Sequence, residues 1–143
     1  MQHVKNKSMI YPILGFVDND NMIYVFQNGQ HFESTSFEIF NQDKNQSQKY
    51  IDSEGCVYKI KNVENLGFKG FFGFSLLLKG RQIKIRTEFY SVTEKVSLED
   101  LKSELLEKID KKKSYWKTSW DISELKQQIN IAGNFKELFL ILK

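Results

Sequence analysis

The segment Phe68–Tyr90, FKGFFGFSLLLKGRQIKIRTEFY, has the clearest alternation of apolar and polar side chains in this chain. A type II′ turn at Gly80-Arg81, with glycine first, would join its two arms as an antiparallel hairpin. The predicted cross-strand pairs are Leu78 with Ile83, Leu76 with Ile85, Phe74 with Thr87, and Phe72 with Phe89. The segment therefore predicts a hairpin over 72–90 with one apolar face turned toward a core and one polar face.

The glycines of this region recur at every third position, at Gly67, Gly70 and Gly73. That spacing fits neither of the glycine-rich phosphate loops, and no helix start follows it to aim amides at a phosphate. Glycine inside a strand more often marks a bulge or a close approach of backbones. No nucleotide or other cofactor is therefore expected here.

Three antiparallel strands are predicted before the hairpin, over 9–17, 22–27 and 30–34. The short polar residues DNDN at 18–21 favour the first turn, and Asn28-Gly29 suits a type I′ turn for the second.

Two further features are expected between residues 34 and 60. Ser34, Thr35 and Ser36 are suited to capping a short helix in SFEIFNQ, before the polar stretch QDKNQSQ. The turn DSEG at 52–55 is predicted to join strands in KYI and CVYKI.

The pattern changes to helical spacing near residue 96. Three capping pairs, each a polar residue followed three positions later by an acid, predict three helix starts: Ser97 with Asp100, Asp121 with Glu124, and Asn134 with Glu137. Each start opens an apolar stripe, and Gly133 is placed to end the second helix. The stripes are Leu98, Leu101, Leu105 and Ile109; Ile122, Leu125, Ile129 and Ala132; and Phe135, Leu138, Phe139 and Leu142.

These elements predict an α+β fold in one domain spanning 1–143. Residues 1–96 are expected to form an antiparallel sheet of about six to seven hairpin-connected strands, and residues 97–143 a helical layer packed on it. A hydrophobic content of 41% and an aromatic content of 14% are typical of a chain that folds.

Few residues suggest catalysis or metal binding. His3 lies in a terminus expected to be frayed, His31 follows the Asn-Gly turn, and Cys56 is a single cysteine in a strand. No paired-cysteine or histidine spacing for zinc is present, and no nucleophile has a base beside it in sequence. We therefore expect neither a metal site nor an enzyme.

The net charge, the cysteine count and the N-terminal segment together indicate a cytoplasmic protein with a mild positive charge. The net charge is +3, which favours an acidic partner or nucleic acid only slightly. One cysteine allows no internal disulfide, and the N-terminal apolar stretch is too short for a signal peptide or a membrane span. Heavy use of Lys, Asn, Ile and Phe indicates an AT-rich bacterial or phage genome.

Two surfaces are candidates for binding a partner. The first combines basic and aromatic residues of the hairpin region, and the second is the connector KKKSYWKTSW at 111–120, which holds both tryptophans. We expect one tryptophan to fill the gap between helices and sheet and the other to be exposed. The candidate residues are Phe68, Phe71, Lys79, Arg81, Lys84, Arg86, Tyr90, Trp116 and Trp120.

The C-terminal third, SLEDLKSELLEKIDKKKSYWKTSWDISELKQQINIAGNFKELFLILK, resembles the tail of small bacterial immunity proteins from toxin systems such as contact-dependent inhibition. The shared features are a capped helix, a Tyr-Trp connector, a second helix at Asp121-Ile122 and a short closing helix. The resemblance implies a cytoplasmic protein that binds and neutralises a toxin domain. The alternative is a nucleic-acid-binding module that uses Lys79, Arg81, Lys84 and Arg86.

Overall fold

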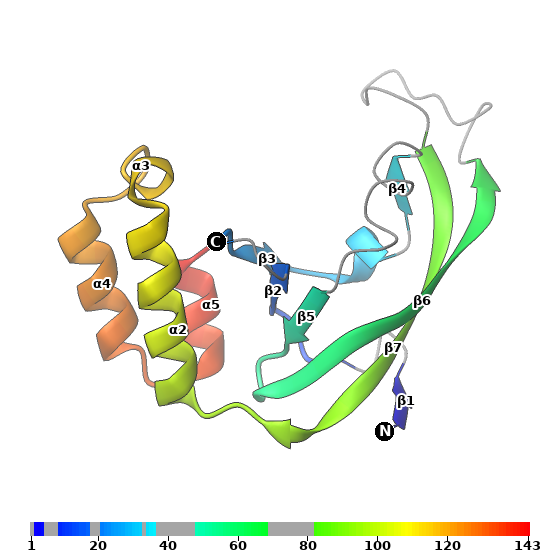
Figure 1. Ribbon diagram of the computed structural model, residues 1–143, viewed down its shortest axis with the longest axis horizontal. Coiled ribbons are helices and arrows are strands. Elements are labelled where there is room, and N and C mark those ends of the chain that lie inside the picture. Colours follow the sequence, from blue (N-terminus) through cyan, green and yellow to red (C-terminus); the bar gives the residue numbers. More distant parts are fainter. Residues whose placement is uncertain (1, 5–8, 18–20, 33, 37–47, 69–81) are drawn as a thin grey trace.

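The computed structural model of the chain describes residues 2–4, 9–17, 21–32, 34–36, 48–68 and 82–143 (Figure 1). The strands are β1 (Gln2–Val4), β2 (Ile13–Val17), β3 (Tyr24–Phe26), β4 (Ser34–Ser36), β5 (Gln48–Ile51), β6 (Cys56–Phe68) and β7 (Gln82–Lys95). The helices are the 3₁₀ helix η2 (Gly29–Phe32) and the α-helices α2 (Leu98–Lys111), α3 (Lys113–Trp116), α4 (Ile122–Ile131) and α5 (Phe135–Ile141).

All the strands belong to one antiparallel sheet in the order β1-β7-β6-β5-β2-β3, and β4 also pairs with β7. The α-helices gather at one end of the molecule, the long β6–β7 ribbon extends at the other, and β2, β3 and β5 lie between them (Figure 1). This arrangement confirms the α+β fold and the helical layer that follows the sheet. Within the described residues, no helix has both the length and the apolarity needed to cross a membrane.

The hairpin predicted over 72–90 is wrong in its pairing. Ile83 lies opposite Phe68 and Phe89 lies opposite Ile60, so the partner arm is β6 rather than 72–78. On the other edge of β7, Thr35 of β4 pairs with Ile83. The expected turn at Gly80-Arg81 and the residues 72–78 lie outside the described residues. Alternation identified the two faces of β7 correctly, but it carries no information about which strand lies alongside.

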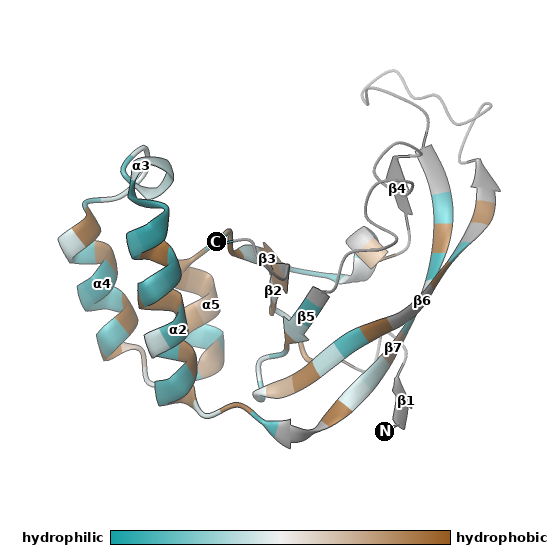
Figure 2. Cartoon of the chain, in the orientation of Figure 1, coloured by the Kyte–Doolittle hydropathy of each residue, from teal (hydrophilic) through white to brown (hydrophobic). Residues whose placement is uncertain are grey.

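The alternation itself is confirmed on β7, where Ile85 and Phe89 are buried while Lys84, Arg86 and Glu88 are exposed. Figure 2 shows the resulting bands of hydrophobic and hydrophilic residues along β6 and β7. Three register shifts interrupt the β6–β7 ladder. Such bulges increase the local twist of a strand pair, which fits the strongly twisted ribbon in Figure 1.

The N-terminal strands are shorter than predicted, and one is replaced by a helix. Strands β2 and β3 fall within 9–17 and 22–27, but the segment predicted as a strand over 30–34 begins with the 3₁₀ helix η2. The Asn28 side chain accepts a hydrogen bond from the amide of Gln30 at 2.9 Å. This local Asx-type bond competes with hairpin pairing, so the predicted type I′ turn does not form.

One further expectation differs from the structure, and another is only partly described. Residues 34–36, expected to cap a short helix, form strand β4 against β7, which offers backbone partners to this segment. His3, expected in a frayed terminus, lies in β1 and pairs with Tyr90. The helix expected in SFEIFNQ after Ser36, and most of the DNDN turn, lie outside the described residues.

Two apolar clusters hold the layers together. The first lies between the sheet and the helices, where Leu14 and Phe16 of β2 meet the stripes of α2, α4 and α5. The second joins residues of β2, η2, β5, β6 and β7 and is rich in aromatic rings. Its members are Met9, Ile13, Phe32, Tyr50, Tyr58 and Phe89. Strand β2 is therefore buried on both faces, since Ile13 belongs to one cluster and Leu14 to the other.

The three predicted helix starts are confirmed by cap hydrogen bonds. Ser97 Oγ accepts the amide of Asp100 at 3.1 Å, Asp121 Oδ1 that of Glu124 at 3.0 Å, and Asn134 Oδ1 that of Glu137 at 2.8 Å. The predicted stripes all belong to, or pack against, the first apolar cluster. The structure adds α3, a single helical turn within the connector.

The turn DSEG is confirmed between β5 and β6, and it positions the helical layer. Gly55 has φ 82°, a left-handed conformation that favours glycine. Its carbonyl accepts the amide of Val96, just before α2, at 3.1 Å. The ring of Phe135 at the start of α5 comes so close that a Cβ on Gly55 would lie 2.8 Å from it.

Replacing Gly55 with alanine is expected to lower the free energy of unfolding by about 2–4 kcal/mol. The substitution combines left-handed strain with overpacking against Phe135. Gly133→Ala is the matched control, because its added Cβ would meet only the exposed Glu137 carboxylate at 3.3 Å. Urea denaturation of both variants measures the difference, and equal stabilities would contradict the packing role of Gly55.

Candidate partner-binding surfaces

The outward face of β6 and β7 carries a mixed set of charges. Arg86 donates a hydrogen bond from Nη1 to Glu64 Oε2 at 3.1 Å, and both side chains are exposed. Glu88 is exposed on the same face as Lys84 and Arg86. The described part of this face is therefore close to balanced in charge, which weakens the case for a basic nucleic-acid surface.

The remaining hairpin candidates are only partly described. Phe68 ends β6 opposite Ile83, and Tyr90 is half-buried on β7. Phe71, Lys79 and Arg81 lie outside the described residues. The structure therefore places Lys84, Arg86 and Tyr90 on one strand, but it does not test the whole predicted cluster.

The connector between α2 and α4 is held by hydrogen bonds among its own residues. The amide of Trp116 bonds to the carbonyl of Lys112 at 3.2 Å, that of Lys117 to Lys113 at 2.9 Å, and that of Trp120 to Trp116 at 3.0 Å. Thr118 adds a side-chain bond to the carbonyl of Tyr115 at 2.8 Å. These bonds fix the connector as a preformed shape at one end of the molecule (Figure 1).

The two tryptophans have different environments. Trp116 is 6% exposed and belongs to the first apolar cluster, so it is the residue that fills the gap between the helices. Trp120 is half-buried and packs against the same cluster, so neither indole is fully exposed. The indole N–H of Trp116 is buried without a hydrogen-bond partner among the described residues. Trp116 is thus held by the burial of its ring and not by a polar contact.

Tyr115 is the exposed aromatic residue of the connector, at 53% exposure. Its ring packs edge-on against Trp116, with centroids 5.4 Å apart. Reasoning from the sequence selected the tryptophans and missed this tyrosine. Helical spacing could not have found it, because α2 ends at Lys111 and Lys112 has non-helical backbone angles, so the stripe of Leu105 and Ile109 does not run on into α3.

The connector is also rich in lysine. Residues 111–120 carry four lysines and no acidic residue. Lys111 pairs with Glu107 at 2.9 Å and Lys113 with Asp110 at 3.7 Å. Lys112 and Lys117 form no ion pair with a described residue.

The two acidic residues behind the connector are held in their charged form. The hydrogen bond from Lys111 lowers the pKa of Glu107 below its ordinary value. A hydrogen bond from Lys126 lowers the pKa of Asp110, and Lys113 adds to the effect. Both carboxylates are exposed, and they neutralise only part of the positive charge of the connector.

Asp52 forms the most extensively bonded polar cluster among the described residues. Its side chain is 1% exposed and accepts the hydroxyl of Tyr58 at 3.1 Å and the amides of Glu54 and Cys56 at 3.0 Å each. The amide of Ile10 donates a fourth, longer hydrogen bond to the Asp52 carboxylate at 3.4 Å. These donors satisfy the buried carboxylate, which thereby holds the turn.

Of the other residues considered for chemistry, Cys56 lies beside it, with its amide bonded to Asp52 and its side chain hydrogen-bonded to the Tyr58 phenol. Burial raises the pKa of the Tyr58 phenol above its ordinary value, and the neighbouring Asp52 charge adds to the shift. His3 lies in β1 and His31 in η2, on different segments from Asp52. Among the described residues, no three His, Cys, Asp or Glu side chains gather as ligands for a metal ion.

Comparison of the chain with known protein families, with curated proteins and with solved structures gave no significant match. A proposed function therefore rests on the surface chemistry of the chain itself.

Truncating the two tryptophans is expected to separate their roles. Trp116→Ala should lower the free energy of unfolding by about 3–5 kcal/mol, because it removes a large side chain from the core. Trp120→Ala should lower it by less than about 2 kcal/mol, since this ring is half-buried. Thermal denaturation measures both, and a larger loss for Trp120 would contradict the assignment.

The burial of the Tyr58 phenol beside the Asp52 charge raises its pKa and predicts a distinct dependence of stability on alkaline pH. Above pH 10 the unfolded chain releases the Tyr58 proton while the folded chain retains it. The free energy of unfolding should therefore fall by up to about 1.4 kcal/mol per pH unit from this residue alone, with its full contribution present below pH 10.

Tyr58→Phe should be less stable than the wild type by about 1–3 kcal/mol at pH 7, because Asp52 loses a donor. Its stability should then fall less steeply than that of the wild type between pH 10 and 11. Denaturant titrations across this range measure both slopes. Parallel curves would show that the phenol is not protected in the folded state.

Proposed function

We propose that this protein is a non-enzymatic binding protein that works in the cytoplasm as an immunity protein and neutralises a toxin by docking on it. The observation that carries the proposal is the connector, a rigid segment that exposes Tyr115 among lysines. Tyrosine is enriched among the residues that dominate binding energy at protein interfaces. A preformed segment also loses little conformational entropy on binding.

The buried polar residues support the same proposal. Asp52 and Tyr58 bond to each other and to the turn, which gives them a structural role. Lys102 is 6% exposed, and its Nζ donates to the carbonyl of Asn130 at 3.0 Å near the end of α4, where positive charge is favourable. The polar side chains buried in the described core therefore act within the fold, and the exposed side chains remain for recognition.

The resemblance of residues 97–143 to immunity proteins is the reason for proposing a toxin as the partner. The features quoted for that resemblance are the capped helices and the Tyr-Trp connector, and the connector contains the exposed tyrosine. Nucleic-acid binding through the β7 face is the weaker alternative, because Arg86 is paired with Glu64 and Glu88 lies on the same strand face.

Co-expression with the protein encoded by the neighbouring gene tests the proposal. We expect a complex that survives size-exclusion chromatography and restores growth to cells that produce the toxin. A Gly55→Ala variant with reduced stability should protect less well, whereas Gly133→Ala should protect fully. If the wild type gives neither complex nor rescue, the proposed function is wrong.

A further inference from the structure

We infer that the basic connector, defined as residues 111–120, is the docking surface of this protein and that it binds an acidic surface of a partner protein. The inference rests on the proposed function and adds the location of the contact and the chemistry of the partner. In the notation of Figure 1, this surface is the end of α2, the single turn α3 and the chain leading to α4.

Charge complementarity identifies the kind of partner. The connector has four lysines and no acid, and Lys112 and Lys117 are without an ion-pair partner among the described residues. The pairs of Lys111 and Lys113 are exposed, and exposed ion pairs contribute little and exchange readily. Lys111, Lys113 and Lys117 are exposed and therefore accessible to carboxylates of a partner, and Lys112 is half-buried. The described part of the β7 face lacks this excess, since Glu64 and Glu88 offset Lys84 and Arg86.

The same segment that carries the lysines also offers an apolar anchor. Tyr115 is 53% exposed, and its ring packs edge-on against the buried Trp116. An exposed aromatic side chain in a charged segment matches the aromatic centre and polar rim of a protein interface. Because Trp116 is buried in the core, its contact with Tyr115 holds the Tyr115 ring against the packed part of the molecule.

The same features favour protein over nucleic acid as the partner. Single-stranded nucleic acid binds along basic grooves that present several aromatic rings for base stacking. The connector is one short helical turn whose one exposed ring, Tyr115, offers a single stacking surface rather than several.

The test uses the full-length protein and three short probes. The probes are the peptide (Glu-Glu-Leu)4, its charge-reversed counterpart (Lys-Lys-Leu)4 and a 12-nucleotide oligo-dT. Amide chemical shifts in a ¹⁵N–¹H spectrum locate binding, and fluorescence anisotropy gives the Kd. We expect the acidic peptide alone to perturb residues 111–120, with an affinity that falls as salt is added.

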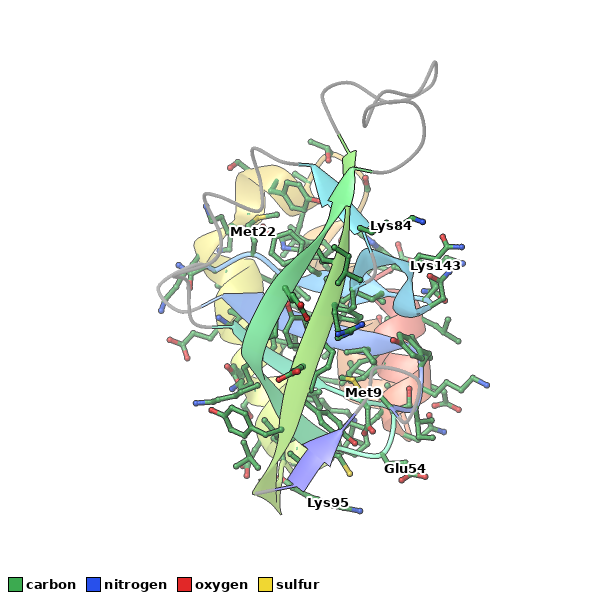
Figure 3. All side chains as sticks on the ribbon, turned by 90° about the vertical axis from the view of Figure 1, so that its right-hand side faces the viewer. Met9, Met22, Glu54, Lys84, Lys95 and Lys143 are labelled. Atoms are coloured by element: carbon green, nitrogen blue, oxygen red, sulfur yellow. The ribbon has the colours of Figure 1, made fainter. Side chains whose placement is uncertain are left out.

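Matched variants separate the connector from the rest of the positive charge. The double variant Lys113→Glu with Lys117→Glu should weaken binding of the acidic peptide at least tenfold. The control Lys84→Glu with Lys95→Glu changes the charge equally, uses exposed lysines of β7 (Figure 3), and should change the Kd less than twofold. Tyr115→Ala should weaken binding several-fold while lowering the melting temperature by only a few degrees, since the ring loses one edge-on contact with Trp116 and otherwise lies outside the core.

Several results would overturn the inference. These are shifts that map to β6 and β7, equal effects of the two double variants, tighter binding of oligo-dT, or no binding of the acidic peptide at millimolar concentration. The growth assay distinguishes the two proposals. If the connector variant protects cells as well as the wild type, the inference fails and the proposed function stands. If the acidic peptide binds at the connector but no toxin complex forms, the proposed function fails.

Discussion

The carboxylate of Asp52 holds together segments that are distant in sequence. It accepts hydrogen bonds from Tyr58 in β6, from the turn at Glu54 and Cys56, and from Ile10 before β2. At 1% exposure it is shielded from water, so these donors replace its hydration. Loss of one donor would leave a buried negative charge incompletely compensated, which is among the more damaging changes a core can undergo.

The turn that Asp52 organises also places the helical layer. Ser53 bonds through its amide to Ile10 and through its hydroxyl to Pro12, which fixes the entry to β2. The carbonyl of Gly55 accepts the amide of Val96 just before α2, and Gly55 leaves room for the ring of Phe135 at the start of α5. The turn at 52–55 therefore contacts the starts of both helices. At the other end of β2, Phe16 lies beneath the ammonium groups of Lys49 and Lys108, at 5.3 and 4.8 Å from its ring centre. The sheet and the helices are thus joined at both ends of β2.

Most apolar side chains of the described sheet and helices pack in the two clusters, which explains why we assign recognition to the connector. Burying β2 on both faces consumes most of the aromatic and aliphatic side chains of the described sheet, and the helices use their stripes to cover one side of it. The connector takes part in the core through Trp116 and the half-buried Trp120, which leaves the neighbouring Tyr115 and most of the lysines outside. A surface that is rigid because one of its residues is buried is well suited to binding without rearrangement.

The sequence by itself determined the local structure of this protein. The helix starts could be predicted from Ser97, Asp121 and Asn134, because each capping side chain bonds to an amide only three residues away. The 52–55 turn could be predicted from Asp, Ser and Gly for the same reason, since the conformation of a turn depends on neighbouring residues. Alternation also identified the buried face of β7.

Only the tertiary structure decided which strands pair and which aromatic side chains reach the surface. Ile83 pairs with Phe68, and residues 34–36 form a strand, because the neighbouring backbone comes from distant parts of the chain. Trp116 is buried and Tyr115 is exposed because the helices pack on the sheet in one rotation about their axes. Backbone pairing and helix rotation depend on long-range packing, and the spacing of residues along one chain does not specify either of them.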